Sequence, residues 1–141
     1  MRNLLNCTCS DKFSSLAPFL LRVVVGAIFL AHGWQKLSGG VDGTAGFLGS
    51  LGFPAPELFA VLLIAAEVLG GAFLILGLFT HWAAKVLVIV SAVALVSVHL
   101  TKGFFVASGG YEFILLILVT VISVMITGPG RWSLDSTLRK R

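Results

Sequence analysis

The sequence contains few charged residues. Lys, Arg, Asp and Glu make up 11% of its 141 residues, against about 25% in a typical soluble domain. A soluble protein of this length needs more charge than that to cover its exterior. Hydrophobic residues make up 57% of the chain, and the mean hydropathy is +1.03. These values exclude intrinsic disorder and a soluble two-domain enzyme, and they predict one compact domain whose apolar surface faces a lipid bilayer.

Cysteine is also scarce, which excludes a secreted module stapled by disulfides. The two cysteines, Cys7 and Cys9, are spaced C-x-C and do not form the C-x-x-C pattern of redox motifs. The segment from Met1 to Lys12 has no apolar core followed by a small-residue cleavage site. We therefore expect residues 1–17 to form a tail and not a signal peptide, and we assign no role to the two thiols.

Several cofactor and nucleophile motifs are absent. The chain has no G-x-G-x-x-G after a strand, no P-loop and no nucleophile elbow. We therefore expect no covalent cofactor, and any redox chemistry would need a lipid-soluble molecule or a partner protein. The net charge is +4, but no basic stripe interleaved with aromatics indicates nucleic acid as a partner.

Four continuous apolar stretches remain, each near the roughly 20 residues that cross a bilayer. They run from about 18 to 37, 57 to 78, 82 to 99 and 111 to 127. They predict an all-α integral membrane four-helix bundle over residues 18–127. In the first outer loop, a glycine-rich segment followed by Phe47, Leu48 and Leu51 predicts a short interfacial helix.

The basic residues near the ends of these stretches are distributed unevenly. One side has only Lys36 and Lys102; the other has Arg2, Lys12, Arg22, Lys85, Arg131, Arg139, Lys140 and Arg141. Because basic residues accumulate on the cytoplasmic side, both termini are expected there, including a basic tail at 128–141. Arg22 lies slightly inside the first stretch, and we expect it to snorkel back to the membrane interface, where Trp34, Trp82 and Trp132 would also sit.

Small residues predict where the helices touch. Ala27 with Ala31, and Ala66 with Gly70, recur four residues apart and so share a helix face, and Gly70 and Gly71 form a further small pair on the second stretch. Such pairs let two backbones approach closely without side-chain volume between them. We therefore expect these two faces to be helix contacts.

Glu67 stands near the middle of the second apolar stretch and hence of the membrane. An acidic residue at that depth costs about 2.5–3.5 kcal/mol on insertion scales, so it must face the bundle interior, be neutral or have a partner. One interpretation is structural, with a neutral Glu67 that hydrogen-bonds a neighbouring helix. The other is functional, because ionisable residues inside the membrane mark ligand and proton sites.

Four further polar residues are expected in the same outer half of the bundle. His32 and Lys36 are four residues apart and share a helix face, His99 ends the third stretch, and Glu112 begins the fourth. Converging titratable groups support proton exchange with a bound molecule. The structural alternatives are interfacial histidines and a Glu112 helix cap. A metal site is disfavoured, because these residues come from different helices without a short ligand spacing.

Several spaced motifs accompany these residues. They are Ile28–Leu37 (IFLAHGWQKL), Ala66-Glu67 with Gly70-Gly71, Gly77–Thr80 (GLFT), His99 with Gly103–Phe105, Gly109–Glu112 (GGYE), and Gly128–Arg131 with Ser133–Asp135. In this order they resemble the DoxX family of small bacterial inner-membrane proteins. The resemblance covers about residues 20–135, and an ordered set of motifs is more specific than any one of them.

The resemblance implies four transmembrane helices in the bacterial inner membrane and a redox role. Relatives include a subunit of a thiosulfate:quinone oxidoreductase, and some members are linked to oxidoreductase complexes that handle thiol and oxidative stress. It also implies that the family's polar positions are His32, Lys36, Glu67, His99 and Glu112 in this chain. Cys7 and Cys9 lie outside the matching region.

The leading hypothesis is a membrane subunit that binds a quinone or another lipophilic molecule. Glu67 with His99 or His32 would exchange protons catalytically, Lys36 and Glu112 would bind the ligand, and a soluble or membrane oxidoreductase partner would supply electrons. One alternative is a small proton-coupled carrier with Glu67 as coupling site, which would need to form a homo-oligomer. Another is a scaffold that recruits a soluble oxidoreductase through its tails or loops.

Overall fold

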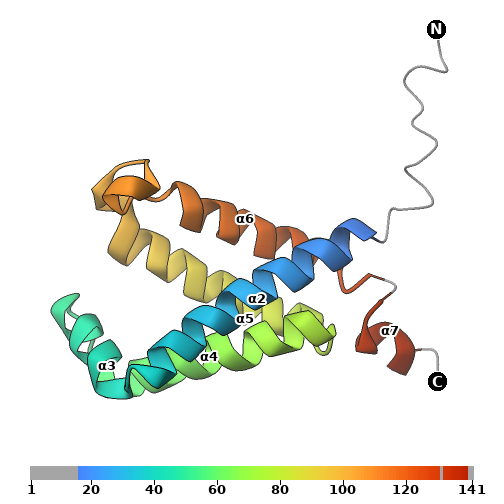
Figure 1. Ribbon diagram of the computed structural model, residues 1–141, viewed down its shortest axis with the longest axis horizontal. Coiled ribbons are helices and arrows are strands. Elements are labelled where there is room, and N and C mark those ends of the chain that lie inside the picture. Colours follow the sequence, from blue (N-terminus) through green and yellow to red (C-terminus); the bar gives the residue numbers. More distant parts are fainter. Residues whose placement is uncertain (1–15, 131, 140–141) are drawn as a thin grey trace, which may run out of the picture.

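The computed structural model describes residues 16–130 and 132–139, and the first part of the expected N-terminal tail, including Cys7 and Cys9, lies outside them. The all-α prediction is confirmed for the described residues. The α-helices are α2 (Leu16–Ser38), α3 (Val41–Ser50), α4 (Pro56–Leu76), α5 (Thr80–Ala94), α6 (Glu112–Thr127) and α7 (Leu134–Leu138) (Figure 1). A π-helix, η2 (Leu95–His99), and a 3-10 turn, η3 (Leu100–Lys102), continue α5, and a second 3-10 turn, η4 (Val106–Ser108), lies in the loop before α6.

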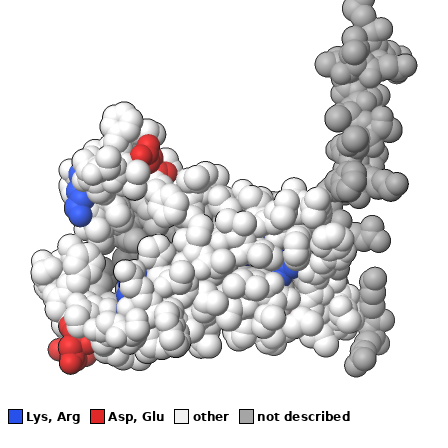
Figure 2. Space-filling model, in the orientation of Figure 1, with Lys and Arg blue, Asp and Glu red and all other residues white. Residues whose placement is uncertain are grey.

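Three helices are long and apolar enough to cross a membrane. They are α2, α4 and the continuous helical segment Thr80–Lys102, whereas α6 is equally apolar but has only 16 residues. Large apolar side chains on their outer faces are exposed, as at Leu62, Ile89 and Ile126. The flank of the molecule shows almost no charge in Figure 2, where the visible acidic groups gather at one end. This is the surface expected of helices packed in lipid.

The helices form one bundle in which sequence neighbours are also neighbours in space. Helix α4 packs against both α2 and α5, α5 packs against α6, and α6 returns to α2. The main core lies between these helices and is built from Val25, Phe29, Leu74, Ala83, Ala84, Leu87, Ile117, Val121 and Val124. Apolar residues from α2, α4, α5 and α6 therefore meet in the centre, which fixes the relative positions of the helices that carry polar groups.

Glycines, more than alanines, make the closest helix contact. A Cβ added at Gly71 of α4 would lie 2.6 Å from Leu30 N and 2.7 Å from Gly26 O of α2. The predicted contact through Ala27 and Ala31 is wrong, because both side chains are exposed. They lie on α2 positions that turn away from α4, whereas Gly26 faces it. Gly70 does make the expected close approach, with its α-carbon against Leu87 of α5.

The close contact at Gly71 predicts different effects on stability for two glycine-to-alanine substitutions. Gly71→Ala is expected to lower the free energy of unfolding by about 1–3 kcal/mol, because the new methyl group would overlap backbone atoms of α2 that cannot move aside. Gly46→Ala on α3 has nothing within 4 Å of the new methyl group, so it is expected to be neutral or slightly stabilising, since alanine favours a helix over glycine. Apparent melting temperatures in detergent measure both, and equal shifts would contradict the close contact.

The short helix predicted in the first outer loop is present as α3. It begins after Gly40, whose φ of 89° requires glycine, and it packs on α4 through Ala45, Leu48 and Ala60. Together α3 and the 103–111 loop form one end of the bundle, called the α3 end below. The opposite end, which carries α7, is called the α7 end (Figure 1).

Arg22 does not behave as the expected interfacial anchor. The prediction that it snorkels to the membrane interface is wrong, because the residue is 0% exposed. Its Nη1 donates to Leu74 O and Ile75 O, each at 2.8 Å, and its Nη2 donates to Trp132 O at 2.5 Å. Two of these carbonyls belong to the last turn of α4 and the third to the C-terminal segment. Because they are buried away from water, the guanidinium supplies the hydrogen bonds that they need.

The C-terminal segment folds back onto the bundle. Asp135 of α7 accepts hydrogen bonds from Phe79 N at 2.8 Å and Thr80 N at 2.9 Å, and its own N–H donates to Gly77 O at 2.9 Å. Its carboxylate thus caps the N-terminus of α5, where the helix dipole favours an anion. Part of the expected basic tail is therefore a fixed piece of the α7 end.

Candidate functional site

A buried ion pair joins α2 to α4. Lys36 Nζ lies 2.7 Å from Glu67 Oε2 and 3.0 Å from Oε1, so the ammonium group donates to both carboxylate oxygens. Glu67 is 6% exposed, and the Lys36 side chain is 28% exposed. The partner that a carboxylate inside a membrane requires is therefore the lysine of the neighbouring helix.

A glycine one turn earlier on α2 brings the two groups together. A Cβ at Gly33 would lie 2.7 Å from Val68 Cγ2 and 3.0 Å from Glu67 Cβ. Only a residue without a side chain lets α2 come this close to α4 at the level of Glu67. Lys36 is three residues further along the same helix face, so its flexible chain reaches the carboxylate across a short gap. Gly33 belongs to the Ile28–Leu37 motif, but nothing in the sequence alone distinguishes its role from that of the other glycines.

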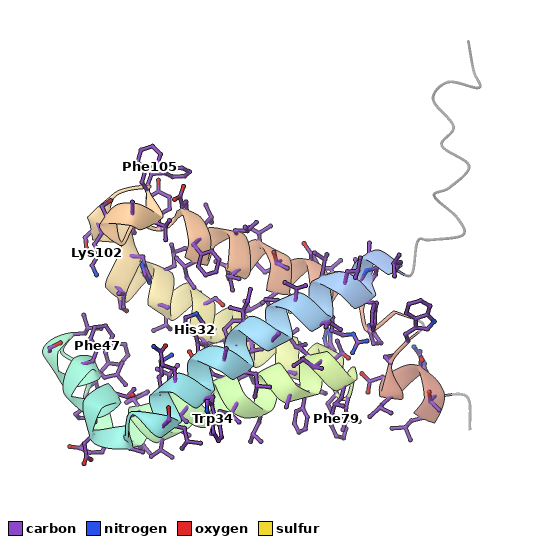
Figure 3. All side chains as sticks on the ribbon, in the orientation of Figure 1. His32, Trp34, Phe47, Phe79, Lys102 and Phe105 are labelled. Carbon is purple, nitrogen blue, oxygen red and sulfur yellow. The ribbon has the colours of Figure 1, made fainter. Side chains whose placement is uncertain are left out.

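A large apolar groove runs beside this ion pair. It has a volume of about 970 Å³ and is bounded mainly by α3, α4 and α5. Its apolar lining includes Phe47, Leu51 and Phe53 near α3; Phe59, Leu62, Ala66 and Phe73 from α4; and Phe79, Trp82, Val86, Ile89 and Val93 along α5. Phe47 and Phe79 lie at opposite ends of the molecule (Figure 3), so the α4–α5 groove extends along most of α4.

Three of the five predicted site residues line the α4–α5 groove. They are Lys36, Glu67 and His99, each contributed by a different helical segment. Lys36 and His99 belong to the half of the groove nearer the α3 end, where the molecular surface is visibly hollowed in Figure 2, and Glu67 stands near the middle of α4. The groove therefore combines a long apolar wall with a few titratable groups, which is the usual composition of a small-molecule site.

His99 occupies an irregular part of its helix. The regular α5 ends at Ala94, and His99 closes the π-helix η2 before the chain turns into η3. A π-turn inserts an extra residue and so redirects the side chains that follow it, often at functional sites. The imidazole is half-buried, and its Nδ1 lies 2.7 Å from Gly109 O.

The other two predicted residues do not line the groove. His32 is exposed on α2 (Figure 3). Glu112 begins α6, and its Oε1 accepts a hydrogen bond from Val106 N at 2.6 Å while its N–H donates to Phe104 O at 2.9 Å. Glu112 therefore ties the 103–111 loop to α6, which is close to the capping role considered as the alternative.

Within residues 16–130 and 132–139, no three His, Cys, Asp or Glu side chains lie close enough together to hold a metal ion. The groove instead offers one ammonium, one carboxylate and one imidazole beside apolar walls. Such a set can orient a polar ring and hold or move a proton at a carboxylate oxygen or an imidazole nitrogen.

Comparison with known proteins identifies the family. A family model described as DoxX matches residues 17–100, a range that includes α2, α4, α5 and the residues Lys36, Glu67 and His99. The chain belongs to the DoxX family. The motifs around His32–Lys36 and Glu67–Gly71 thus lie on α2 and α4 within the matched range, whereas those at 103–112 and 128–135 lie beyond it.

Two relatives extend over most of the chain, and a third matches about half of it. A Bacillus subtilis protein named "Putative oxidoreductase CatD" is 34% identical over 89% of this chain and 89% of its own length. An uncharacterised membrane protein of Mycobacterium tuberculosis is 35% identical over 86% of this chain and 80% of its own length. The Escherichia coli inner membrane protein YphA is 38% identical over 49% of this chain and 51% of its own length. No solved structure matches the chain.

These findings, with the three long apolar helices, show a multi-pass membrane protein of the DoxX family. The localisation expected from the low charge content is thereby confirmed.

Proposed function

We propose that this protein is the membrane subunit of a redox system and binds a quinone, or another lipophilic ring compound, in the α4–α5 groove. One observation carries the proposal: the Lys36–Glu67 ion pair and His99 line an apolar groove with a volume of about 970 Å³. Support also comes from a relative that covers most of the chain and bears the name "Putative oxidoreductase CatD".

The groove fits a long apolar molecule with a polar head. From Phe59 to Phe73 the α4 wall extends for about 21 Å at 1.5 Å per residue, and aromatic side chains line both its ends. Residues on its rim, such as Leu62, Val86 and Ile89, are exposed on the apolar flank of the bundle. A ligand would therefore enter sideways from the bilayer, with its tail along α4 and its head beside Glu67.

The proposal includes a defined orientation in the membrane. Helix α6 would be the fourth span, covering about 24 Å and relying on local thinning of the bilayer. Both termini would be cytoplasmic, because basic residues accumulate on that side and, among the described ones, Arg22, Lys85 and Arg139 belong to the α7 end and Lys36 and Lys102 to the α3 end. The polar part of the groove would then lie in the outer half of the inner membrane.

The chain's own residues would bind the ligand and move protons. Lys36 would hold the ligand's carbonyl or anionic oxygen by its remaining N–H, and Glu67 and His99 would hold protons at Oε and at the imidazole. His32 receives no role here, because it is outside the groove. A quinone, when bound, can accept two electrons and two protons. A partner oxidoreductase would deliver the electrons.

Filling the groove next to Glu67 is expected to remove ligand binding. Ala66→Phe places a phenyl ring against the carboxylate-bearing face, whereas Ala27→Phe adds the same volume at an exposed position of α2 that is not part of the groove. A short-chain quinone should therefore bind the Ala27→Phe variant as it binds the parent and bind the Ala66→Phe variant at least tenfold more weakly. Quenching of Trp82 fluorescence in detergent measures this, since Trp82 lines the groove.

The same preparation tests the function itself. Mass spectrometry of protein purified gently from its native membrane is expected to find a quinone or a similar lipophilic compound, and less of it with Ala66→Phe. Glu67→Gln keeps the shape of the side chain but not its charge, and should slow electron transfer to quinone in membranes that contain the partner. A preparation without any lipophilic ligand, together with an unaffected Glu67→Gln variant, would refute the proposal.

A further inference from the structure

The hydrogen bond of His99 determines which ring nitrogen carries the proton. His99 Nδ1 lies 2.7 Å from Gly109 O. A carbonyl oxygen has no hydrogen to donate, so the hydrogen in this bond must belong to Nδ1. In a neutral imidazole the other nitrogen, Nε2, is then unprotonated and acts as an acceptor. No other described residue bonds to Nε2, and His99 lines the groove.

The loop that carries Gly109 is held in place by a network of backbone bonds. Gly109 adopts a φ of 81°, which favours glycine, and its N–H donates to Val106 O at 2.8 Å. The next residue, Gly110, has no room for a side chain, since its Cβ would lie 2.6 Å from Phe104 C. The Gly109 carbonyl is therefore presented to the imidazole at a fixed place.

Glu112 closes this network from the start of α6. Its carboxylate accepts the Val106 N–H at 2.6 Å, and Val106 O is the group that receives the Gly109 N–H. Two bonds thus connect the Glu112 carboxylate to the residue that holds His99. Glu112 acts on the groove through the loop and does not line it.

The hydrogen-bonding groups that face the ligand are consequently rich in acceptors. Two N–H bonds of the Lys36 ammonium are used by Glu67, which leaves a single donor there. The Glu67 oxygens and His99 Nε2 are acceptors. A site with this composition favours a molecule that brings its own hydroxyl hydrogen, because a bound ligand would cover His99 Nε2, and an acceptor covered without a donor is costly.

We propose that His99 presents an unprotonated Nε2 to the groove, that Glu112 is a positioning residue for it, and that the site therefore prefers the hydroxyl-bearing form of an aromatic ring, a quinol or a phenol, over its ether or carbonyl forms. The ligand preference rests on the proposed function. The tautomer and the role of Glu112 do not, so they are tested separately.

Nitrogen NMR of protein with 15N-labelled histidine tests the tautomer. In alkaline buffer, the His99 signals are expected to show a protonated Nδ1 and an unprotonated Nε2, with assignment by the His99→Asn variant. Glu112→Ala should shift His99 toward a mixture of the two tautomers. Glu112→Gln retains an acceptor for Val106 N and should therefore keep the single tautomer of the parent protein.

His81 provides a reference in the same spectra, because its Nδ1 lies 3.2 Å from Met125 O, a contact between the start of α5 and the end of α6 that does not involve the 103–111 loop. Its signals should not respond to either Glu112 variant. A protonated Nε2 on His99 in the parent would overturn the tautomer assignment. A His99 signal that Glu112→Ala leaves unchanged would overturn the positioning role.

Competition between three compounds tests the ligand preference. Without oxygen, a short-chain quinol should bind about tenfold more tightly than its dimethyl ether or the matching quinone, as expected for one net hydrogen bond. His99→Asn can still donate from its amide to Gly109 O but has no counterpart of Nε2, so it should abolish this difference. Equal binding of the three compounds would overturn the preference, and binding of none would overturn the proposed function while the NMR result stands by itself.

Discussion

Lys36→Met is expected to destabilise the protein more than any other change in the groove. It leaves the 6% exposed Glu67 carboxylate without its partner, and removing one member of a buried pair costs about 3–5 kcal/mol. Because the Lys36 side chain is 28% exposed, we expect the lower part of that range. The measurement is the apparent melting temperature in detergent, together with the yield from the membrane fraction.

The double variant Lys36→Met/Glu67→Met separates charge from packing. It removes both members of the pair and leaves no unpaired charge, so it is expected to recover most of the stability lost in Lys36→Met. Quinone binding should not recover with it, since the ammonium and carboxylate groups proposed to hold the ligand's head are gone and only His99 remains. Lys102→Met, at an exposed position of the same end, serves as the matched single control and should be neutral. If the double variant is as unstable as the single one, the loss comes from the lysine's packing and not from the ion pair.

Arg22→Met is expected to have a comparable effect at the opposite end. The guanidinium makes three hydrogen bonds to backbone carbonyls of Leu74, Ile75 and Trp132, and it is 0% exposed. Methionine fills most of the volume but satisfies none of these acceptors, so the free energy of unfolding should fall by about 3–5 kcal/mol. Thermal unfolding in detergent measures the loss.

A second readout tests whether Arg22 holds the C-terminal segment. Protease cleavage after Gly130 should become much faster in Arg22→Met and in Asp135→Ala, because both variants release α7 from the bundle. Arg139→Met changes a basic residue that is exposed on α7, and its cleavage rate should equal that of the parent. Unchanged cleavage in Arg22→Met would mean that the Asp135 cap alone fastens the segment.

The membrane-spanning elements could be predicted from the sequence because their signal is local. A run of apolar residues as long as α2 or α4 predicts both a helix and a lipid environment around it. In lipid, only a helix or a closed barrel satisfies the backbone N–H and C=O groups. The α3 helix was also predictable from its own glycines and apolar residues. The π-helix before His99 was not, because nothing in the residues Leu95–His99 distinguishes it from a regular helix.

Burial of particular side chains was harder to predict. Ala27 and Ala31 share a helix face, but so do Gly26 and Gly33, and only the packing of α2 on α4 selects the second pair. Arg22 lies near a predicted boundary in the sequence, where snorkelling is the usual outcome. The carbonyls that bind it belong to residues 52, 53 and 110 positions away, and no local pattern reveals that distance.

Of the candidate site, sequence reasoning found the unusual residues but not their arrangement. Placing an ionisable group inside the membrane costs free energy, so such residues stand out in an apolar chain. Glu67 and the other polar candidates could therefore be identified from the sequence and their expected depth in the membrane. Which of them share a cavity depends on helix rotation and on the loop before α6. The structure brings Lys36, Glu67 and His99 to one groove and uses Glu112 in the loop.

The sequence by itself determined that this protein is an all-α membrane protein of the DoxX family and that few of its residues can carry chemistry. The scarcity of charged residues predicts that the surface of the protein faces lipid, and the ordered motifs indicate the family. Only the tertiary structure decided that Lys36 pairs with Glu67, that His99 is held by Gly109, and that Arg22 fastens the C-terminal segment. Each of these contacts joins separate elements, and its free energy depends on distances of a few ångströms that no local sequence pattern encodes.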